Sequence, residues 1–267
     1  MRLAFIGGGN MGEAMLAAIL EKGLSTAGNV TVSDISEPRR RYLKQKYGVT
    51  VTGDNRQAAA ESDVVVLAVK PPQLAEAMNG LSGRLHAAQL VLSIVAGAAT
   101  GTLCRGLGHS CVIRVMPNTP AQIGEGISVW TATTEVSKEQ KAQAAAILGA
   151  MGRQVYVTDE RYLDMATAVS GSGPAYVFLF AEALTSAAVD IGLPDDMARE
   201  LALETVLGSA RFMQGSDRPP AELRRMVTSP GGTTAAALAR LEKGQFTELI
   251  RQAVRAAYER AKELGNQ

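Results

Sequence analysis

The sequence predicts an α/β fold with a doubly wound, mainly parallel sheet in its first part and helices alone in its second. Three observations lead to this prediction. Apolar runs of strand length alternate with helical stretches over residues 1–158, a glycine cluster directly follows the first run, and strand-like runs cease after about residue 159. With 267 residues, the chain is long enough for two domains at a rough guide of about 150 residues each.

Seven apolar runs are the expected strands. They are continuous rather than alternating, which is typical of strands buried on both faces of a parallel sheet. The runs cover residues 3–7, 30–34, 64–69, 90–96, 111–116, 127–132 and 154–158.

Helical stretches separate these runs, and two of them carry start signals. Pro38 suits the first turn of a helix, and Ser137 with Gln140 forms a capping-box pattern. Strands that alternate with helices predict βαβ units and therefore a mainly parallel sheet. The expected helices cover residues 10–22, 37–47, 71–79 and 138–151.

The rest of the chain is rich in Ala, Leu, Glu and Arg and is expected to be helical. We therefore expect two domains, 1–158 and 159–267, without a flexible linker between them. The expected helices of the second domain cover residues 160–192, 195–214, 219–227, 233–243 and 246–264.

Composition excludes several classes of protein. A net charge of +1 and an aromatic content of 4% argue against a nucleic-acid surface, and the longest apolar stretch contains acidic and hydroxyl groups that a bilayer span tolerates poorly. The two cysteines form no CxxC pair, no cluster of metal ligands is present, and the N-terminus lacks the features of a secretory signal. We expect a cytoplasmic protein without a metal or a membrane partner.

The glycine cluster at residues 7–12 has the form Gly7-x-Gly9-x-x-Gly12, between an expected strand and an expected helix. Glycine permits the tight turn and the close approach of a pyrophosphate, and the helix N-terminus offers unpaired N–H groups to it. This context predicts a Rossmann-like dinucleotide-binding domain. A plain glycine-rich turn is the weaker alternative.

The form of the dinucleotide is left open by the residues near the second strand. Asp34 ends that strand, where an acidic group favours NAD by binding the adenosine ribose. Arg39 and Arg40 follow it and could hold a 2′-phosphate, or could simply lie on a solvated helix face.

The absence of histidines from the expected loops at the strand ends restricts the chemistry. Both histidines, His86 and His109, lie outside the expected loops at the strand ends and are expected on the surface. A histidine base of the kind that oxidises hydroxy acids is therefore not expected. A C=N bond suits such a site, because a protonated imine accepts hydride once it is oriented against the nicotinamide.

Three segments resemble the hallmark segments of the pyrroline-5-carboxylate reductases: residues 114–121 (RVMPNTPA), 170–184 (SGSGPAYVFLFAEAL) and 226–238 (MVTSPGGTTAAAL). The resemblance covers essentially the whole chain. It implies reduction of L-1-pyrroline-5-carboxylate to L-proline, the last step of proline synthesis, with NADPH, or NADH as the alternative. It also implies a helical domain that interlocks two subunits, with further assembly into a decamer.

The resemblance also implies roles for individual residues. The cofactor would contact Gly7, Gly8, Gly9, Asn10, Met11, Gly12, Ser33, Asn55, Ala68, Val69, Lys70, Pro71, Ala96 and Gly97. The small-molecule substrate would contact Ser229, Gly231, Gly232, Thr233 and Thr234, and Glu160 would border its pocket.

The turn at residues 229–234 suggests how the substrate is held. We expect its carboxylate on the backbone N–H groups of Gly231, Gly232 and Thr233, at the start of a helix. Thr234 is the expected catalytic residue, through a hydrogen bond between its hydroxyl and the ring nitrogen. One of the two threonines is also expected to cap the helix.

Two other functions fit parts of the sequence. A β-hydroxyacid dehydrogenase would share the glycine fingerprint but needs a lysine just after residues 171–173, where the chain reads Pro-Ala-Tyr-Val-Phe. A non-catalytic dinucleotide sensor would keep the fingerprint but would have no use for a substrate loop.

Overall fold

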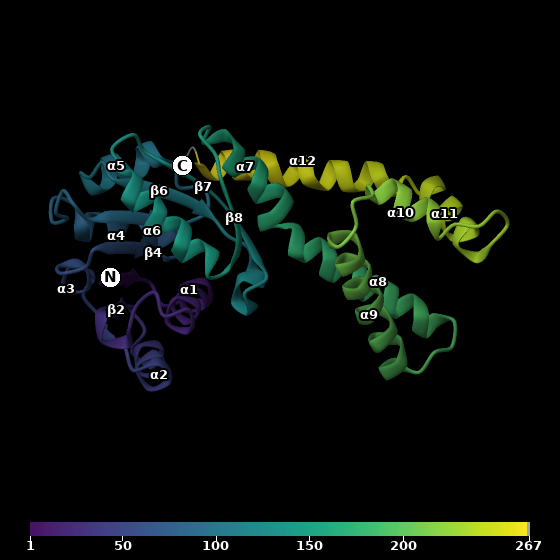
Figure 1. Cartoon of the computed structure of the whole chain (residues 1–267), viewed down its shortest axis with the longest axis horizontal. Coiled ribbons are helices and arrows are strands. Elements are labelled where there is room, and N and C mark those ends of the chain that lie inside the picture. Colours follow the sequence, from purple (N-terminus) through teal and green to yellow (C-terminus); the bar gives the residue numbers. More distant parts are fainter. Residues whose placement is uncertain (266–267) are drawn as a thin grey trace. The chain divides into compact units, whose positions relative to one another are not determined.

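The computed structural model describes residues 1–265. The first part of the chain forms an eight-stranded sheet. The strand order is β3-β2-β1-β4-β5-β6-β7-β8, and every neighbouring pair is parallel except β6 with β7. The predicted mainly parallel, doubly wound sheet is therefore confirmed (Figure 1). The strands are β1 Leu3–Ile6, β2 Val30–Ser33, β3 Thr50–Thr52, β4 Val64–Leu67, β5 Leu90–Ser93, β6 Val112–Met116, β7 Gly126–Ala132 and β8 Gly152–Tyr156.

Helices cover both faces of the sheet. On one face α1 (Asn10–Glu21), α2 (Glu37–Tyr47) and α6 (Lys138–Gly149) enclose one apolar cluster. On the other face α3 (Asn55–Ala59), α4 (Leu74–Leu81) and α5 (Thr100–Leu107) enclose a second cluster. Successive residues of β1 alternate between the two clusters, and the central strands β1, β4 and β5 are buried along their whole length, as their continuous apolar sequences predict.

Strand β3 and helix α5 have no counterpart among the predicted elements. Strand β3 is three residues long and mostly polar, and α5 begins Thr-Gly-Thr, so neither has an apolar run of its own. Helix α5 is nevertheless fixed by Leu103 and Leu107, which are fully buried against the sheet. The capping box at Ser137 and Gln140 is confirmed.

The helix expected over residues 160–192 is divided. Helix α7 (Arg161–Ala166) continues into a π-helical turn at Thr167–Gly171, and α8 (Gly173–Asp190) begins after Ser172. Pro174 has no N–H group, and its ring would clash with a preceding carbonyl inside a helix, so it lies in the first turn of α8 instead.

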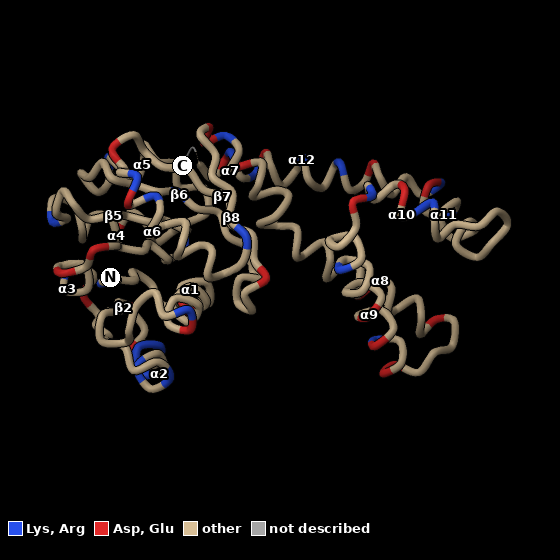
Figure 2. The backbone as a smooth tube through the Cα atoms, viewed as in Figure 1, with Lys and Arg blue, Asp and Glu red and all other residues tan. Residues whose placement is uncertain are grey.

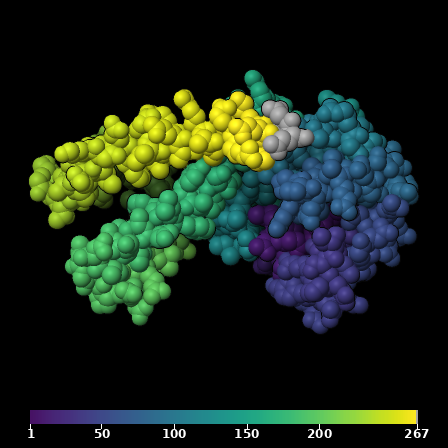
Figure 3. All heavy atoms as spheres, turned by 180° about the vertical axis from the view of Figure 1, so that it is seen from behind, coloured from purple at the N-terminus to yellow at the C-terminus, as the bar shows by residue number. Residues whose placement is uncertain are grey.

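The chain forms two compact units, described here separately. The first comprises residues 1–172 together with 257–265, and the second comprises 173–256. In the structure, α7 and the end of α12 (Phe246–Gly265) pack with the sheet, so the boundary between the two units lies after residue 172. The domain boundary expected from the sequence lies after residue 158. Leu264 near the end of α12 lies beside Gly97, and Figure 3 shows the yellow end of this helix against the blue part of the first unit.

The second unit consists of helices α8, α9 (Asp195–Gln214), α10 (Pro220–Met226), α11 (Thr233–Lys243) and most of α12 (Phe246–Gly265). Its apolar side chains are largely exposed. Among residues 173–256 only Ala198, Ala202 and Leu223 are buried apolar residues, whereas Phe178 and Leu179 are each 65% exposed. Figure 2 shows that α8 carries almost no charge along its length. A unit without its own core needs another apolar surface to cover it.

Candidate functional site

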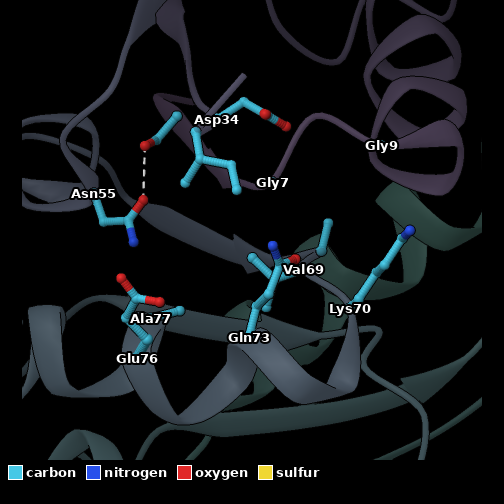
Figure 4. Close-up of a pocket in the computed structure, with 12 residues that line it drawn as sticks. Gly7, Gly9, Asp34, Asn55, Val69, Lys70, Gln73, Glu76 and Ala77 are labelled. Atoms are coloured by element: carbon cyan, nitrogen blue, oxygen red, sulfur yellow. Dashed lines mark hydrogen bonds between the residues drawn. The ribbon is translucent and has the colours of Figure 1, made fainter. Parts of the chain in front are cut away.

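A cavity of about 290 Å³ opens at the carboxyl ends of the central strands. It lies where the strand order reverses between β1 and β4, which is the usual ligand position in doubly wound sheets. Figure 4 shows its side chains, which come from the ends of β1, β2 and β4 and from α3 and α4.

Seven of the predicted cofactor residues line this cavity: Gly7, Gly9, Ser33, Asn55, Ala68, Val69 and Lys70. The cavity is also lined by five residues that were not predicted as cofactor contacts: Asp34, Ile35, Gln73, Glu76 and Ala77. The other predicted contacts, Gly8, Asn10, Met11, Gly12, Pro71, Ala96 and Gly97, lie outside its lining.

The glycine turn needs glycine for close packing. Gly7 has φ +97°, and a Cβ atom there would lie 2.8 Å from the Ala68 carbonyl carbon and oxygen. A Cβ on Gly12 would lie 2.7 Å from the Gly7 carbonyl oxygen. A Cβ on Gly9 would meet nothing within 4 Å, so the open side of the turn faces the cavity.

Helix α1 starts at this turn without a side-chain cap. Its N-cap is Gly9, and the first N–H groups of a helix have no acceptor within the helix itself. These donors, together with the positive end of the helix, suit a phosphate. The geometry therefore fits a dinucleotide pyrophosphate.

Three polar residues, Ser33, Asp34 and Asn55, line the end of the cavity beside β2. The Ser33 hydroxyl donates to Asn55 Oδ1 at 2.7 Å, shown dashed in Figure 4. Asp34 accepts from two backbone N–H groups at 2.8 Å each, from Gly8 on Oδ2 and from Ser36 on Oδ1. The carboxylate is thus held at the rim of the cavity by the glycine turn itself.

The two arginines proposed for a 2′-phosphate are both bonded to protein groups. Arg39 donates to the Gly8 carbonyl and forms an ion pair with Glu13. Arg40 donates to the Asp34 carbonyl at 2.6 Å. Neither arginine lines the cavity, whereas Asp34 does.

Glu13, in the first turn of α1, accepts hydrogen bonds from four side chains of α2, a grouping that no sequence pattern indicates. Besides Arg39, it accepts from Tyr42, Lys46 and Tyr47 at 2.8–3.1 Å. Burial alone would raise the pKa of this carboxyl, but the bonds from Lys46, Tyr47, Arg39 and Tyr42 outweigh burial and lower the pKa to about 2. The cluster ties α2 to the helix that begins at the glycine turn.

The turn at Ser229–Thr234 belongs to the second unit and has a defined backbone. Gly231 has φ +71°, and the Gly232 N–H donates to the Ser229 carbonyl at 3.1 Å. Gly232 is the N-cap of α11 and no side chain caps the helix, so the expectation of a threonine cap is wrong. Thr233 and Thr234 are instead the first two helical residues, whose N–H groups have no intrahelical acceptor.

Glu160 lies in the first unit, just before α7. Its Oε1 accepts from the Thr100 N–H at 2.8 Å and from Arg114 Nη1 at 2.9 Å, and its Oε2 accepts from the Thr100 hydroxyl at 2.7 Å. Burial raises the pKa of this carboxyl, but the bonds from Thr100 and Arg114 outweigh burial and hold the pKa below its usual value. Both of its oxygens therefore already have protein partners.

The histidines differ from each other in their surroundings. His86 is exposed as expected, but His109 is buried, and its Nε2 lies 2.8 Å from the Gln89 carbonyl. The surface expectation is wrong for His109, because the turn after α5 folds it back against the segment before β5.

Comparison with known proteins places the chain in a family. Residues 160–264 match the model for pyrroline-5-carboxylate reductase dimerisation, and residues 2–97 match the model for NADP oxidoreductase, coenzyme F420-dependent. A pyrroline-5-carboxylate reductase of Synechocystis sp. is 44% identical over 99% of this chain and 98% of its own. The chain belongs to the pyrroline-5-carboxylate reductase family.

Solved structures of this family have the same fold. The reductase of Coxiella burnetii is 40% identical, with a TM-score of 0.88 over 98% of both chains. The reductase of Plasmodium falciparum, solved with NADP bound, is 33% identical, with a TM-score of 0.91 over 99% of this chain and 98% of its own. The predicted order, a dinucleotide-binding α/β part followed by a helical part of the dimerisation type, is therefore confirmed.

Among residues 1–265, the helices are all too short or too polar to cross a bilayer.

Proposed function

We propose that this protein reduces L-1-pyrroline-5-carboxylate to L-proline with NADPH, with NADH as the alternative reductant. The observation that carries the proposal is the Ser229–Thr234 turn, which exposes unpaired N–H groups at the start of α11 in a chain whose first unit has a dinucleotide cavity. Membership of the family over the full length supports it. The NADP bound to the Plasmodium falciparum relative favours NADPH.

In this proposal the cofactor lies across the carboxyl ends of the strands. The first-turn N–H groups of α1 bind its pyrophosphate, Ser33 and Asn55 bind near the adenosine ribose, and the segment Ala68–Pro71 lines its middle. Ala96 and Gly97 border the nicotinamide. When bound, the reduced nicotinamide supplies the hydride that a C=N carbon accepts.

The substrate carboxylate binds at the start of α11. Because the Gly232 N–H already donates to Ser229, the first-turn N–H groups of Thr233 and Thr234 are the better donors, together with that of Gly231. The Thr234 hydroxyl oxygen accepts a hydrogen bond from the protonated ring nitrogen and holds one face of the ring toward the nicotinamide. Glu160 borders this site through the Thr100 segment.

Two subunits complete the site. The apolar helices of the second unit lack a covering surface within residues 173–256, and a second copy of the chain supplies one. The Ser229–Thr234 turn of one subunit then serves the cofactor of its partner. We further propose that dimers assemble into a decamer and that the enzyme is cytoplasmic.

The test is a steady-state assay of NADPH oxidation with pyrroline-5-carboxylate, repeated with NADH. Thr234→Ala should lower kcat/KM by about 10- to 1000-fold, which corresponds to the loss of a transition-state hydrogen bond. Thr234→Ser keeps the hydroxyl and should stay within about threefold of the parent. Turnover of 3-hydroxyisobutyrate with NAD, but none of pyrroline-5-carboxylate, would reject the proposal.

A further inference from the structure

Arg114 on β6 is a buried cation with two anionic partners. Its side chain is 6% exposed, and its Nη1 and Nη2 lie 2.9 Å from Glu160 and 2.6 Å from Asp164. A guanidinium this deeply buried is tolerated only when it is paired. Both carboxylates come from the segment that starts α7, so the cluster fixes α7 to the sheet.

The loop after β5 covers residues 94–99 and leads into α5 at Thr100. Only one of the two carboxylates also contacts this end of the loop. Glu160 accepts both the N–H and the hydroxyl of Thr100, the first residue of α5. That N–H has no acceptor within its helix, and the positive end of the helix favours an anion there. In the described residues no hydrogen bond joins Asp164 to this loop.

On its other side, the loop packs against the end of α12. Gly97 has φ +77°, and a Cβ atom there would lie 2.9 Å from Leu264 Cβ of α12. Within the loop, the Ala98 N–H donates to the Val95 carbonyl. The segment Ala96–Thr100 is therefore held between the end of α12 at Gly97 and the Glu160 carboxylate at Thr100.

We propose that Glu160 is a positioning residue for hydride transfer: through Thr100 it fixes the Ala96–Gly97 loop against which the nicotinamide ring rests. The inference rests on the proposed function, since only a nicotinamide at Ala96–Gly97 gives the loop this role. It also reassigns Glu160, which acts through Thr100 rather than by touching the substrate. A displacement of about 1 Å at a reacting group can lower the rate by about 100-fold.

Two variants separate positioning from stability. Glu160→Gln and Asp164→Asn each remove one negative charge from Arg114, so both should lower Tm by similar amounts. Only Glu160→Gln disturbs the Thr100 contacts. We expect it to lower kcat about 10- to 100-fold, with less than threefold change in the KM for pyrroline-5-carboxylate and in the Kd for NADPH measured by fluorescence.

The step that changes is identified by isotope effects. With 4-deuterated NADPH as reductant, Glu160→Gln should show a larger primary isotope effect on kcat than the parent, because hydride transfer becomes more rate-limiting. Asp164→Asn should keep kcat within threefold of the parent and leave the isotope effect unchanged.

Thr100→Val tests the same contact without altering a buried charge, and serves if Glu160→Gln does not fold. It should reproduce part of the kcat loss, and adding it to Glu160→Gln should cost no more than about twofold further, because both changes break one contact. Equal kcat losses in Glu160→Gln and Asp164→Asn, or parental kcat in Thr100→Val, would overturn the inference. Absence of turnover in the parent enzyme would reject the proposed function itself.

Discussion

Replacing Glu13 by Gln tests whether the cluster around this carboxylate stabilises the first unit. The carboxyl pKa falls from 4.5 to about 2 on folding, a shift equivalent to at most about 3 kcal/mol. Its side chain is 15% exposed, but the Lys46 partner is 49% exposed, so water screens part of the interaction. We expect Glu13→Gln to lower the free energy of unfolding by about 1–2 kcal/mol at pH 7.

The pH dependence has a definite sign. A carboxyl with a depressed folded pKa stabilises the protein above its unfolded pKa, near 4.5, and this contribution disappears as pH falls toward 2. The difference between parent and variant should therefore be full at pH 7 and less than half as large at pH 3.

The assay is urea unfolding followed by circular dichroism at pH 7, 5, 4 and 3, at one fixed protomer concentration. Glu37→Gln is the matched control, because Glu37 forms an exposed i,i+4 pair with Arg41 on α2 and should change stability by less than about 0.5 kcal/mol. A Glu13→Gln deficit that is the same at pH 3 as at pH 7, or no deficit at pH 7, would refute the reasoning.

Three further predictions concern the coenzyme, the loop and the assembly. Asp34→Ser removes a carboxylate from the cavity rim and should raise the NADPH-to-NADH ratio of kcat/KM by about tenfold or more; an unchanged ratio in steady-state kinetics would count against a selective role. Gly97→Ala places a methyl group against Leu264 in a left-handed backbone and should lower kcat about tenfold or more, whereas Gly101→Ala, in helix α5, should not. Leu179→Glu puts a charge on the apolar surface of α8 and should shift the mass found by sedimentation toward the monomer; a fully dimeric variant would contradict the assigned interface.

The sequence predicted those parts of the fold that have a local signal. Continuous apolar runs identified the strands, and Gly7, Gly9 and Gly12 predicted the turn at the switch point, because backbone geometry there requires glycine. Strand β3 and helix α5 were missed because contacts with the sheet, rather than their own sequence pattern, stabilise them.

The candidate site was predictable to a smaller extent for the same reason. Ser33 and Asn55 were expected to lie near the cofactor, but the bond between them depends on the approach of two elements 22 residues apart. The Arg114–Glu160 pair spans 46 residues, and nothing local in either segment indicates it. Side-chain networks of this kind follow from the fold and become visible only with it.

The first unit is discontinuous in the chain, and this has a consequence for how the protein is made. Residues 1–172 emerge from the ribosome first, but residues 257–265, which complete the same unit, are synthesised after the whole of the second unit. N-terminal parts generally begin to fold during synthesis. Gly97 therefore gains its Leu264 neighbour only after the whole of the second unit and the final turns of α12 have been synthesised.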